Sequence, residues 1–267
     1  MAQTKYIKSS RDNIEIALDE RYSKNSSVCV ILVHGMGEHK GRYKDFLEKI
    51  HGANISIVAL DIRGHGESGG ERGYIDDFND FVADLGDVIF YVKNRYPHLK
   101  IALMGHSLGG LIATRYAEMK DDVDFPILSN PLVKYPVLTT IFRVIPYKLF
   151  GNIKIKKFKS ESPEMLKYSY SGPLACNYLS LKLLGCIFTI GAPLTYENLE
   201  KVRMSVLLLC GEVDPILNPK RLDTVESRLG SKDKILKTYS GVRHRLLQST
   251  RRNEVVEYII NWLRNHS

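Results

Sequence analysis

The sequence predicts one α/β domain with a mostly parallel central sheet, helices on both faces and one long insertion. Short, nearly unbroken apolar segments recur along the chain, at residues 28–33, 55–60, 101–104, 127–128, 206–210 and 235–239. Parallel strands that are covered on both faces have this composition. Segments with helical periodicity lie between them, and this alternation is typical of a sheet with helices on both sides. The length of 267 residues, with 44% hydrophobic and 25% charged residues, suits one large domain.

The elements follow in order along the chain. Residues 5–8 and 14–21 can form an antiparallel hairpin at the edge of the sheet. Apolar residues at intervals of three and four predict a long helix over residues 78–92, which ends before Pro97. Shorter helical patterns cover residues 111–119 and 255–263.

Residues 131–198 interrupt this rhythm. The segment is much longer than an ordinary crossover connection, and it holds six of the ten prolines. We therefore expect one α/β core from residues 1–130 and 199–267, with 131–198 inserted as a cap over the carboxyl ends of the strands. Its apolar side chains either hold the cap on the body or contact a membrane or an acyl chain: Val137, Leu138, Ile141, Phe142, Val144, Ile145, Leu149 and Phe150.

Ser107 is the candidate nucleophile. It is the centre of Gly105-His106-Ser107-Leu108-Gly109, which stands between a predicted strand and a predicted helix. Such a turn leaves no room for side chains where strand and helix cross, so glycines fit there and the serine is pushed outward on a strained backbone. Ser68 matches the same five-residue pattern, but the glycines that follow it favour a loop.

A nucleophilic serine needs a base and an acid that orients the base. Asp214 follows the strand at 206–210, and His244 follows the strand at 235–239. The chain order Ser107, Asp214, His244 is the order that α/β-hydrolases use. Glu212 is the rival orienting acid on the same loop.

The oxyanion that forms when the serine attacks a carbonyl needs fixed N–H donors, each commonly worth about a hundredfold to a thousandfold in rate. The backbone N–H of Leu108 can supply one donor from the turn. The loop His34-Gly35-Met36-Gly37 follows the strand at 28–33 and places Met36 as the second donor. The glycines of this loop also suit a tight exit from the strand.

Three blocks of sequence resemble the monoacylglycerol lipases and their lysophospholipase-like relatives. They are His34-Gly35-Met36-Gly37-Glu38-His39 with Gly41-Arg42-Tyr43, then Asp61 with Arg63-Gly64-His65-Gly66-Glu67-Ser68, then Gly105-His106-Ser107-Leu108-Gly109-Gly110. The resemblance covers nearly the whole chain. It implies a serine hydrolase of the α/β-hydrolase fold that cleaves the ester of a single-chain lipid under a mobile cap, through an acyl-enzyme.

The resemblance also implies that Glu38 and Arg42 order the oxyanion loop or bind the polar head of the substrate. Alternatively, they form only a surface ion pair at helical i,i+4 spacing, worth under about 0.5 kcal/mol. Two departures from the family pattern stand out. Arg245 follows His244 where relatives commonly carry an acid, and unless it points to solvent it disfavours a protonated imidazole. Ser171-Gly172-Pro173-Leu174 stands where relatives often have Asp-Pro-Leu, which weakens any inherited substrate preference.

The leading functional hypothesis is thus hydrolysis of carboxylic esters of monoacylglycerols or similar lipids. The alternatives are a lysophospholipase, a short-chain ester or amide hydrolase, and a non-catalytic lipid-binding scaffold. No cofactor and no metal site is predicted, since the four cysteines show no metal-ligand spacing.

The net charge of +8 is concentrated in the predicted cap, where residues 131–199 hold nine Lys or Arg against three acids. No nucleic-acid-binding motif accompanies these cations, so peripheral contact with an anionic membrane is the expected use of the charge. No signal peptide and no apolar run of membrane-spanning length is evident. The expected location is cytoplasmic, with reduced cysteines.

Overall fold

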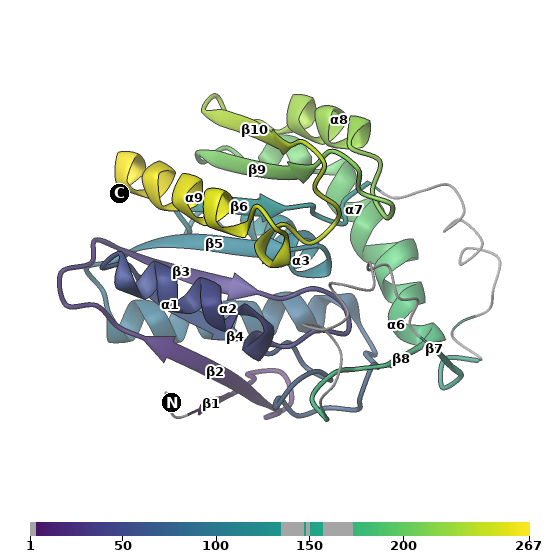
Figure 1. Ribbon diagram of the computed structural model, residues 1–267. Helices are drawn as coiled ribbons and strands as arrows, with labels where there is room; N and C mark the ends of the chain where they lie inside the picture. Colours follow the sequence, from purple (N-terminus) through teal and green to yellow (C-terminus); the bar gives the residue numbers. More distant parts are fainter. Residues whose placement is uncertain (1–3, 135–146, 148–149, 157–172) are drawn as a thin grey trace.

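An eight-stranded sheet forms the centre of the computed structural model, which describes residues 4–134, 147, 150–156 and 173–267 (Figure 1). The strand order is β1-β2-β4-β3-β5-β6-β9-β10. The strands are β1 (Lys5–Lys8), β2 (Glu15–Arg21), β3 (Val28–Val33), β4 (Ser56–Leu60), β5 (Lys100–His106), β6 (Phe125–Ser129), β9 (Val206–Gly211) and β10 (Lys234–Tyr239). Every strand predicted from the sequence is present, so the predicted fold class is confirmed.

In this order, all neighbouring strands from β4 to β10 pair parallel. β2 pairs antiparallel with both β1 and β4. The register aligns the carboxyl ends of the inner strands, because Val33 lies opposite both Leu60 and Gly105. The loops that follow β3, β4 and β5 therefore leave the sheet at one edge. In such sheets this edge carries the working site.

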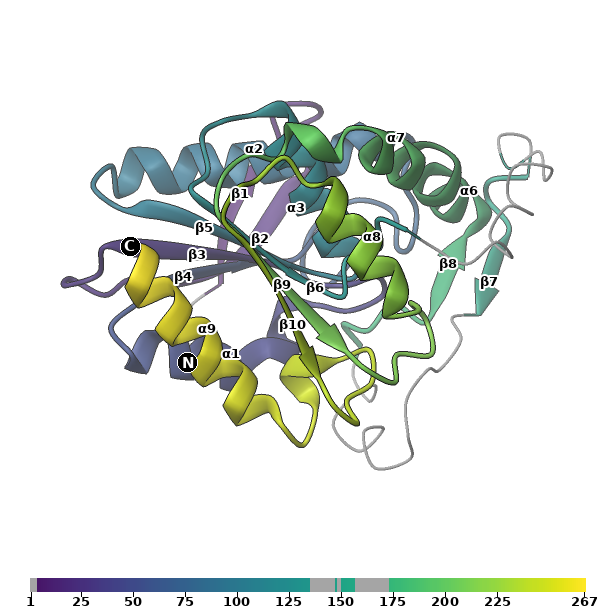
Figure 2. The ribbon, with the colours of Figure 1, turned by 90° about the horizontal axis from the view of Figure 1, so that it is seen from above.

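Helices cover both faces of the sheet (Figure 2). The helices α1 (Lys44–Gly52) and α9 (Arg252–His266) lie on one face. The other face carries α2 (Phe78–Arg95), α3 (Leu108–Met119) and α8 (Lys220–Arg228). β3 and β4 are buried along their whole length, as unbroken apolar runs require.

The long predicted helix is confirmed as α2. It begins at Asp77, whose side chain accepts a hydrogen bond from the N–H of Asn79, and its C-cap is Tyr96, directly before Pro97. The sequence analysis did not predict α1. That helix has nine residues and buries only Phe46, Leu47 and Ile50, so its periodic signal is short.

A second, two-stranded sheet and several helical turns lie beyond the carboxyl ends of the parallel strands, on the side toward which the arrowheads of β3, β9 and β10 point (Figure 1). They are β7 (Lys154–Lys156), β8 (Tyr178–Ser180), α6 (Leu181–Gly185), a π-helix (Cys186–Gly191) and α7 (Ala192–Glu197). Three 3-10 turns complete the described chain: Lys40–Tyr43, Leu199–Lys201 and Leu246–Gln248.

Much of the predicted cap lies outside the described residues. Of its expected apolar side chains, Val137, Leu138, Ile141, Phe142, Val144, Ile145 and Leu149 fall there. Phe150 is described and is 52% exposed.

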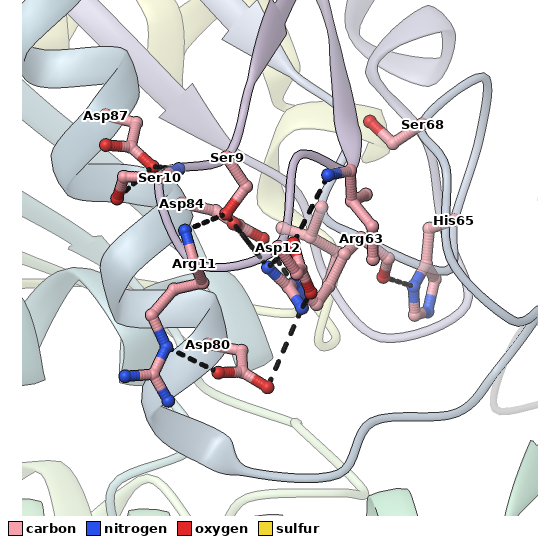
Figure 3. A network of polar contacts seen from close by, with 12 residues as sticks. Ser9, Ser10, Arg11, Asp12, Arg63, His65, Ser68, Asp80, Asp84 and Asp87 are labelled. Atoms are coloured by element: carbon pink, nitrogen blue, oxygen red, sulfur yellow. Dashed lines mark hydrogen bonds and ion pairs between the residues drawn. The ribbon is translucent and has the colours of Figure 1, made fainter.

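A buried arginine fixes the loop that follows β4 (Figure 3). The guanidinium of Arg63 donates to both carboxylate oxygens of Asp84 on α2, at 2.6 and 2.7 Å, and to Asp12 at 2.8 Å. It also donates to the hydroxyl of Ser9, in the turn between β1 and β2. Because two nitrogens of Arg63 donate to the two oxygens of Asp84, this contact fixes the orientation of the guanidinium and also strengthens the ion pair. The network thus ties the edge hairpin and α2 to the loop that starts at Asp61.

Candidate active site

The turn around Ser107 has the geometry that its sequence predicts. The residue joins β5 to α3 with φ 53° and ψ −114°, a conformation that L-residues rarely adopt. A Cβ on Gly105 would lie 2.3 Å from the carbonyl oxygen of Gly109, and a Cβ on Gly109 would lie 2.2 Å from that of Val33. Both glycines are therefore required by the close crossing of strand and helix.

Ser68, the second match to the pattern, belongs to a loop, as predicted. Its hydroxyl accepts a hydrogen bond from the N–H of Ala17 at 2.8 Å and donates to the carbonyl of Asp61 at 2.5 Å. The first contact joins the loop to β2, and the second closes the loop on its first residue, Asp61. The Ser68 hydroxyl therefore has a structural use.

Asp214 and His244 lie side by side, although 30 residues separate them. Oδ2 of Asp214 is 2.6 Å from Nδ1 of His244, and both residues are buried. Oδ1 accepts the backbone N–H groups of Ile216 at 2.7 Å and Leu217 at 3.0 Å, which fixes the plane of the carboxylate. The carboxylate therefore accepts a hydrogen bond from Nδ1–H of His244, which leaves Nε2 as the ring nitrogen without a hydrogen.

Glu212, the rival acid, faces away from His244. Its carboxylate accepts hydrogen bonds from the hydroxyl of Ser240 at 2.6 Å and the N–H of Gly241 at 3.0 Å, and it is exposed. These two hydrogen bonds join the loop after β9 to the turn after β10 at the surface.

Asn130 was missed by the sequence analysis. It follows β6 with φ 42°, and it is completely buried. Its amide donates to the carbonyl of His244 at 2.7 Å and accepts the N–H of Gly211 at 3.3 Å. One side chain thereby clamps the loop of the histidine to the strand that precedes the aspartate. The only signal in the sequence is an asparagine shortly after a predicted strand, since asparagine tolerates a positive φ.

Ser107 and His244 both line one cavity of about 340 Å³. Its lining is largely apolar and comes from the core and from the second sheet and its helices: Met36, Leu132, Ile155, Leu179, Leu184, Phe188 and Ile216. The polar and charged residues of the lining are Glu38, His106, Ser107, Lys156, His244 and Arg245. A pocket with this lining suits a ligand with an apolar chain and one polar group, which would lie beside the serine.

The two predicted oxyanion donors, Met36 and Leu108, belong to the segments that follow β3 and β5. Leu108 is the first residue of α3, directly after Ser107, and Met36 lines the same cavity. The Met36 loop follows β3, which pairs with β5 through Val33 and Gly105. The structure thus brings the loops of both candidate donors to one edge of the sheet.

Glu38 and Arg42 are buried, so the surface ion pair considered from the sequence is wrong. Their side chains are 2% and 5% exposed, and the carboxylate–guanidinium distance is 3.5 Å. Glu38 also accepts hydrogen bonds from the N–H of Gly35 at 3.2 Å and the hydroxyl of Tyr43 at 2.6 Å. It lies in the catalytic cavity, whereas Arg42 lines a second cavity. One carboxylate therefore holds the start of the oxyanion loop.

Arg245 does not point to solvent. Its Nε lies 2.9 Å from Oε1 of Glu38, and its side chain is 5% exposed. Burial lowers the pKa of Arg245, and the carboxylate of Glu38 opposes this effect. The cation that follows His244 in sequence is thus paired with the oxyanion loop.

A second buried carboxylate, that of Asp61, holds the other side of this loop. It accepts the backbone N–H of Lys40 at 2.5 Å and the Lys40 ammonium at 2.9 Å. Nearby, Nε2 of His34 accepts the N–H of Ile62 at 3.1 Å, so the hydrogen is on Nδ1, which donates to the carbonyl of Gly35. His34 is therefore a neutral spacer between the loops after β3 and β4.

His106 is a further residue of the site that the sequence analysis did not assign. Its ring centroid lies 4.9 Å from that of His244, and Nδ1 faces the carbonyl of Ser129 at 3.2 Å. Burial lowers its pKa to about 3, so the ring is neutral at physiological pH. A neutral ring packs against the neighbouring imidazole without repelling its protonated form.

Among the described residues, no group of three or more His, Cys, Asp or Glu side chains could hold a metal ion. None of the described helices combines the length and apolar character that crossing a membrane requires. All four cysteines are buried thiols.

The sheet, the strained serine and the Asp214–His244 pair together define an α/β-hydrolase. The chain matches the family described as "Serine aminopeptidase, S33" over residues 24–251. Monoglyceride lipase of Homo sapiens is 33% identical over 227 residues, which cover 80% of this chain and 74% of that protein. Monoacylglycerol lipase of Mycolicibacterium smegmatis is 27% identical over 248 residues, 89% of this chain and 88% of that protein.

The crystal structure of Paleococcus ferrophilus monoacylglycerol lipase superposes with a TM-score of 0.83 at 27% identity, over 96% of this chain and 100% of that one. The chain therefore belongs to the serine aminopeptidase S33 family of α/β-hydrolases, in its monoglyceride lipase-like branch. The family resemblance and the serine hydrolase class predicted from the sequence are confirmed.

Proposed function

We propose that this protein hydrolyses the ester bond of monoacylglycerols, with Ser107 as nucleophile, His244 as base and Asp214 as its orienting acid. The observation that carries the proposal is the 2.6 Å contact between Asp214 and His244, at a cavity that His244 and the strained Ser107 both line. The relatives named above, monoglyceride and monoacylglycerol lipases, support this choice of substrate.

In the first half of the reaction, Oγ of Ser107 bonds to the ester carbon and its proton passes to Nε2 of His244. The carbonyl electron pair moves to the oxygen, where the N–H groups of Met36 and Leu108 stabilise the negative charge. When this intermediate collapses, the ester C–O bond breaks and the glycerol oxygen takes the proton from His244. The acyl chain stays on the serine.

In the second half, His244 removes a proton from water, which attacks the acyl carbon in the same way. The bond to Oγ breaks, Ser107 recovers its proton and the fatty acid leaves. Asp214 keeps the hydrogen of the resting imidazole on Nδ1 throughout, so Nε2 can accept a proton. Glu38 supports the oxyanion donors indirectly, since it holds Gly35.

We further propose that residues 131–198 form a cap, which supplies most of the apolar wall of the cavity. Ile155, Leu179, Leu184 and Phe188 come from its described part. An apolar wall beside the serine favours a long acyl chain over a short one.

Exposed apolar side chains next to lysines mark the outer side of this cap. Ile153 and Tyr178 are each 52% exposed, and Lys156 stands beside Ile155, which is 41% exposed and lines the cavity. This combination supports docking on an anionic lipid surface, at about 1 kcal/mol for each well-placed cation. A cytoplasmic location with peripheral membrane contact agrees with the four buried thiols.

The catalytic proposal is tested with Ser107→Ala. We expect its kcat for a monoacylglycerol to fall on the order of a millionfold, and labelling by a fluorophosphonate to vanish. Ser68→Ala is the matched control, and it should keep both properties. If Ser107→Ala still turns over the ester, another residue is the nucleophile and the proposal fails.

A substrate panel separates the remaining alternatives. Monoacylglycerol, lysophosphatidylcholine, a short nitrophenyl ester and an aminoacyl amide are compared by kcat/KM. The proposal expects monoacylglycerol to lead. A higher value for lysophosphatidylcholine or the amide would transfer the function to the alternative classes, and an unlabelled, inactive wild type would indicate a lipid-binding scaffold.

Membrane contact is tested by sedimentation with anionic and neutral vesicles. Ile153→Ser combined with Lys156→Gln should weaken binding to anionic vesicles. The control, Phe90→Ser, removes an apolar residue of α2 that is 68% exposed, and it should not weaken binding. Binding that ignores salt and lipid charge would refute the docking proposal.

A further inference from the structure

A second cavity, of about 430 Å³, lies on the α1 and α9 side of the site. It is lined by the 3-10 turn before α1, by the start of α1 and by the segment from Gly241 to Arg252 that carries His244. Among the described residues, none lines both this cavity and the catalytic one. It is therefore a separate pocket, and its lining residues have no role in the proposed hydrolysis.

Four cationic side chains and one carboxylate line this basic cavity. The cations are Arg42, Lys44, Arg243 and Arg252, and the acid is Asp45. The acid faces Arg252 only at 4.0 Å and is 72% exposed. A contact of this length between exposed groups holds little energy. Arg42 is paired with the buried Glu38 at 3.5 Å. The other three cations of the lining still outnumber its one carboxylate.

Two of these cations, Lys44 and Arg252, have only long contacts with acidic side chains. Lys44 lies 3.9 Å from Glu48, at the limit of an ion pair, and its side chain is 67% exposed. Arg252 is 47% exposed. Both side chains can turn into the cavity without breaking a close ion pair, so neither has to lose a strong partner in order to bind an anion.

Gln248 adds a donor inside the same cavity. Its side-chain nitrogen is buried and has no hydrogen-bond partner among the described residues. A buried donor without an acceptor is costly, on the order of 1–3 kcal/mol. This nitrogen has almost no surface open to the cavity, so an anion bound there reaches it only after the Gln248 side chain turns.

We propose that this basic cavity binds a phosphoryl anion. Planar guanidinium groups match the oxygen pairs of a phosphate, a lysine adds a point charge, and the amide of Gln248 supplies a neutral donor. Inorganic phosphate, a small phosphomonoester and the headgroup of an anionic phospholipid share this chemistry. The volume admits a phosphomonoester with a short organic part.

Calorimetric titration of the full chain with inorganic phosphate tests the proposal, with chloride used to keep the ionic strength constant. Wild type should bind phosphate saturably. Lys44→Gln combined with Arg252→Gln removes two charged donors and should weaken binding by at least about tenfold. The matched control, Lys120→Gln with Lys232→Gln, removes two exposed lysines elsewhere and should leave binding unchanged within about twofold.

Two further arms identify the source of the phosphoryl group. Glycerol 3-phosphate is titrated in the same way, and vesicles containing phosphatidic acid are sedimented with each variant. Loss of both soluble and vesicle binding in the cavity variant assigns a lipid headgroup, whereas loss of soluble binding alone assigns a free phosphate ester.

The absence of saturable phosphate binding by wild type, or equal weakening in both double variants, overturns the proposal. Thermal unfolding without phosphate shows that the variants are folded. Because binding is measured without turnover, Ser107→Ala should bind phosphate like wild type. A failure here is thus distinct from a failure of the proposed hydrolysis.

Discussion

Replacing Asp214 by asparagine is expected to abolish catalysis while leaving the fold intact. The two oxygens of Asp214 have different partners: Oδ1 accepts two backbone N–H groups, from Ile216 and Leu217, and Oδ2 faces Nδ1 of His244. In Asp214→Asn, the one remaining oxygen must stay at the position of Oδ1, because two donors point there. The amide nitrogen then faces the imidazole.

An amide N–H that faces Nδ1 forces this nitrogen to act as an acceptor. The imidazole hydrogen moves to Nε2, and Nε2 can no longer take the proton of Ser107. If the amide rotated by 180°, its N–H groups would face the backbone N–H groups of Ile216 and Leu217. The two hydrogen bonds to these donors would then be lost, at about 1–3 kcal/mol each. The variant therefore holds the wrong tautomer, which in a serine triad costs about 10⁴ in kcat, or about 5 kcal/mol of barrier.

The assay is the initial rate of hydrolysis of a monoacylglycerol and of a short nitrophenyl ester at pH 7. Glu212→Gln is the control, since Glu212 stands on the same loop but bonds Ser240 and Gly241. It should keep kcat within about twofold. The reasoning is refuted if Asp214→Asn retains more than about a tenth of wild-type activity, or if Glu212→Gln loses as much.

Three further substitutions test the supporting structure. Glu38→Gln breaks a buried contact of 2.9 Å with Arg245 and should lower the free energy of unfolding by about 3–5 kcal/mol, measured with urea; a loss below about 1 kcal/mol would contradict the assigned network. Ser68→Ala removes two buried hydrogen bonds, so stability should fall by about 1–3 kcal/mol per group left unpaired, while kcat stays within severalfold; a large loss of kcat would count against a purely structural Ser68. Burial raises the pKa of Glu118 from 4.5 to about 8 despite Arg115, so the wild type should lose stability as the pH rises from about 4.5 to 8, by up to about 1.4 kcal/mol per pH unit. Thermal unfolding across this range should show that Glu118→Gln loses much less, whereas the exposed Glu257→Gln should follow the wild type; parallel curves for all three proteins would reject the raised pKa.

The strands and the serine turn were predictable because their signals are local. Each inner strand is covered on both faces, so its sequence is a short apolar run, and Gly105 and Gly109 are required by backbone atoms only a few residues away or in the next strand. The order of Ser107, Asp214 and His244 after successive strands could be read in the same way. Each of these residues follows shortly after the carboxyl end of a strand, and the end of the strand determines its position.

The choice between Asp214 and Glu212 could not be made from the sequence with the same certainty. Both acids follow β9 on one loop, two residues apart. The turn of the backbone decides between them, since it presents two N–H groups to Asp214 and sends Glu212 toward Ser240. No pattern in the side chains encodes that turn directly.

The burial of Glu38 and Arg42 could not be predicted for a different reason. Their spacing is that of a surface pair on a helix, and the sequence shows nothing that would cover them. Arg245, which lies 207 residues beyond Glu38, supplies part of that cover and an opposite charge. A contact between such distant positions becomes visible only when the sheet has brought the loops after β3 and β10 to one edge.

This pairing also gives a physical reason for the departure at position 245. An acid at this position would lie against the carboxylate of Glu38, which already accepts from Gly35 and Tyr43, and two buried carboxylates in contact cannot both ionise without a large cost. Arg245 instead gives Glu38 a counter-charge within 2.9 Å. In this chain the residue after His244 thus helps to fix the carboxylate that holds Gly35, and one buried ion pair links the loops that follow β3 and β10.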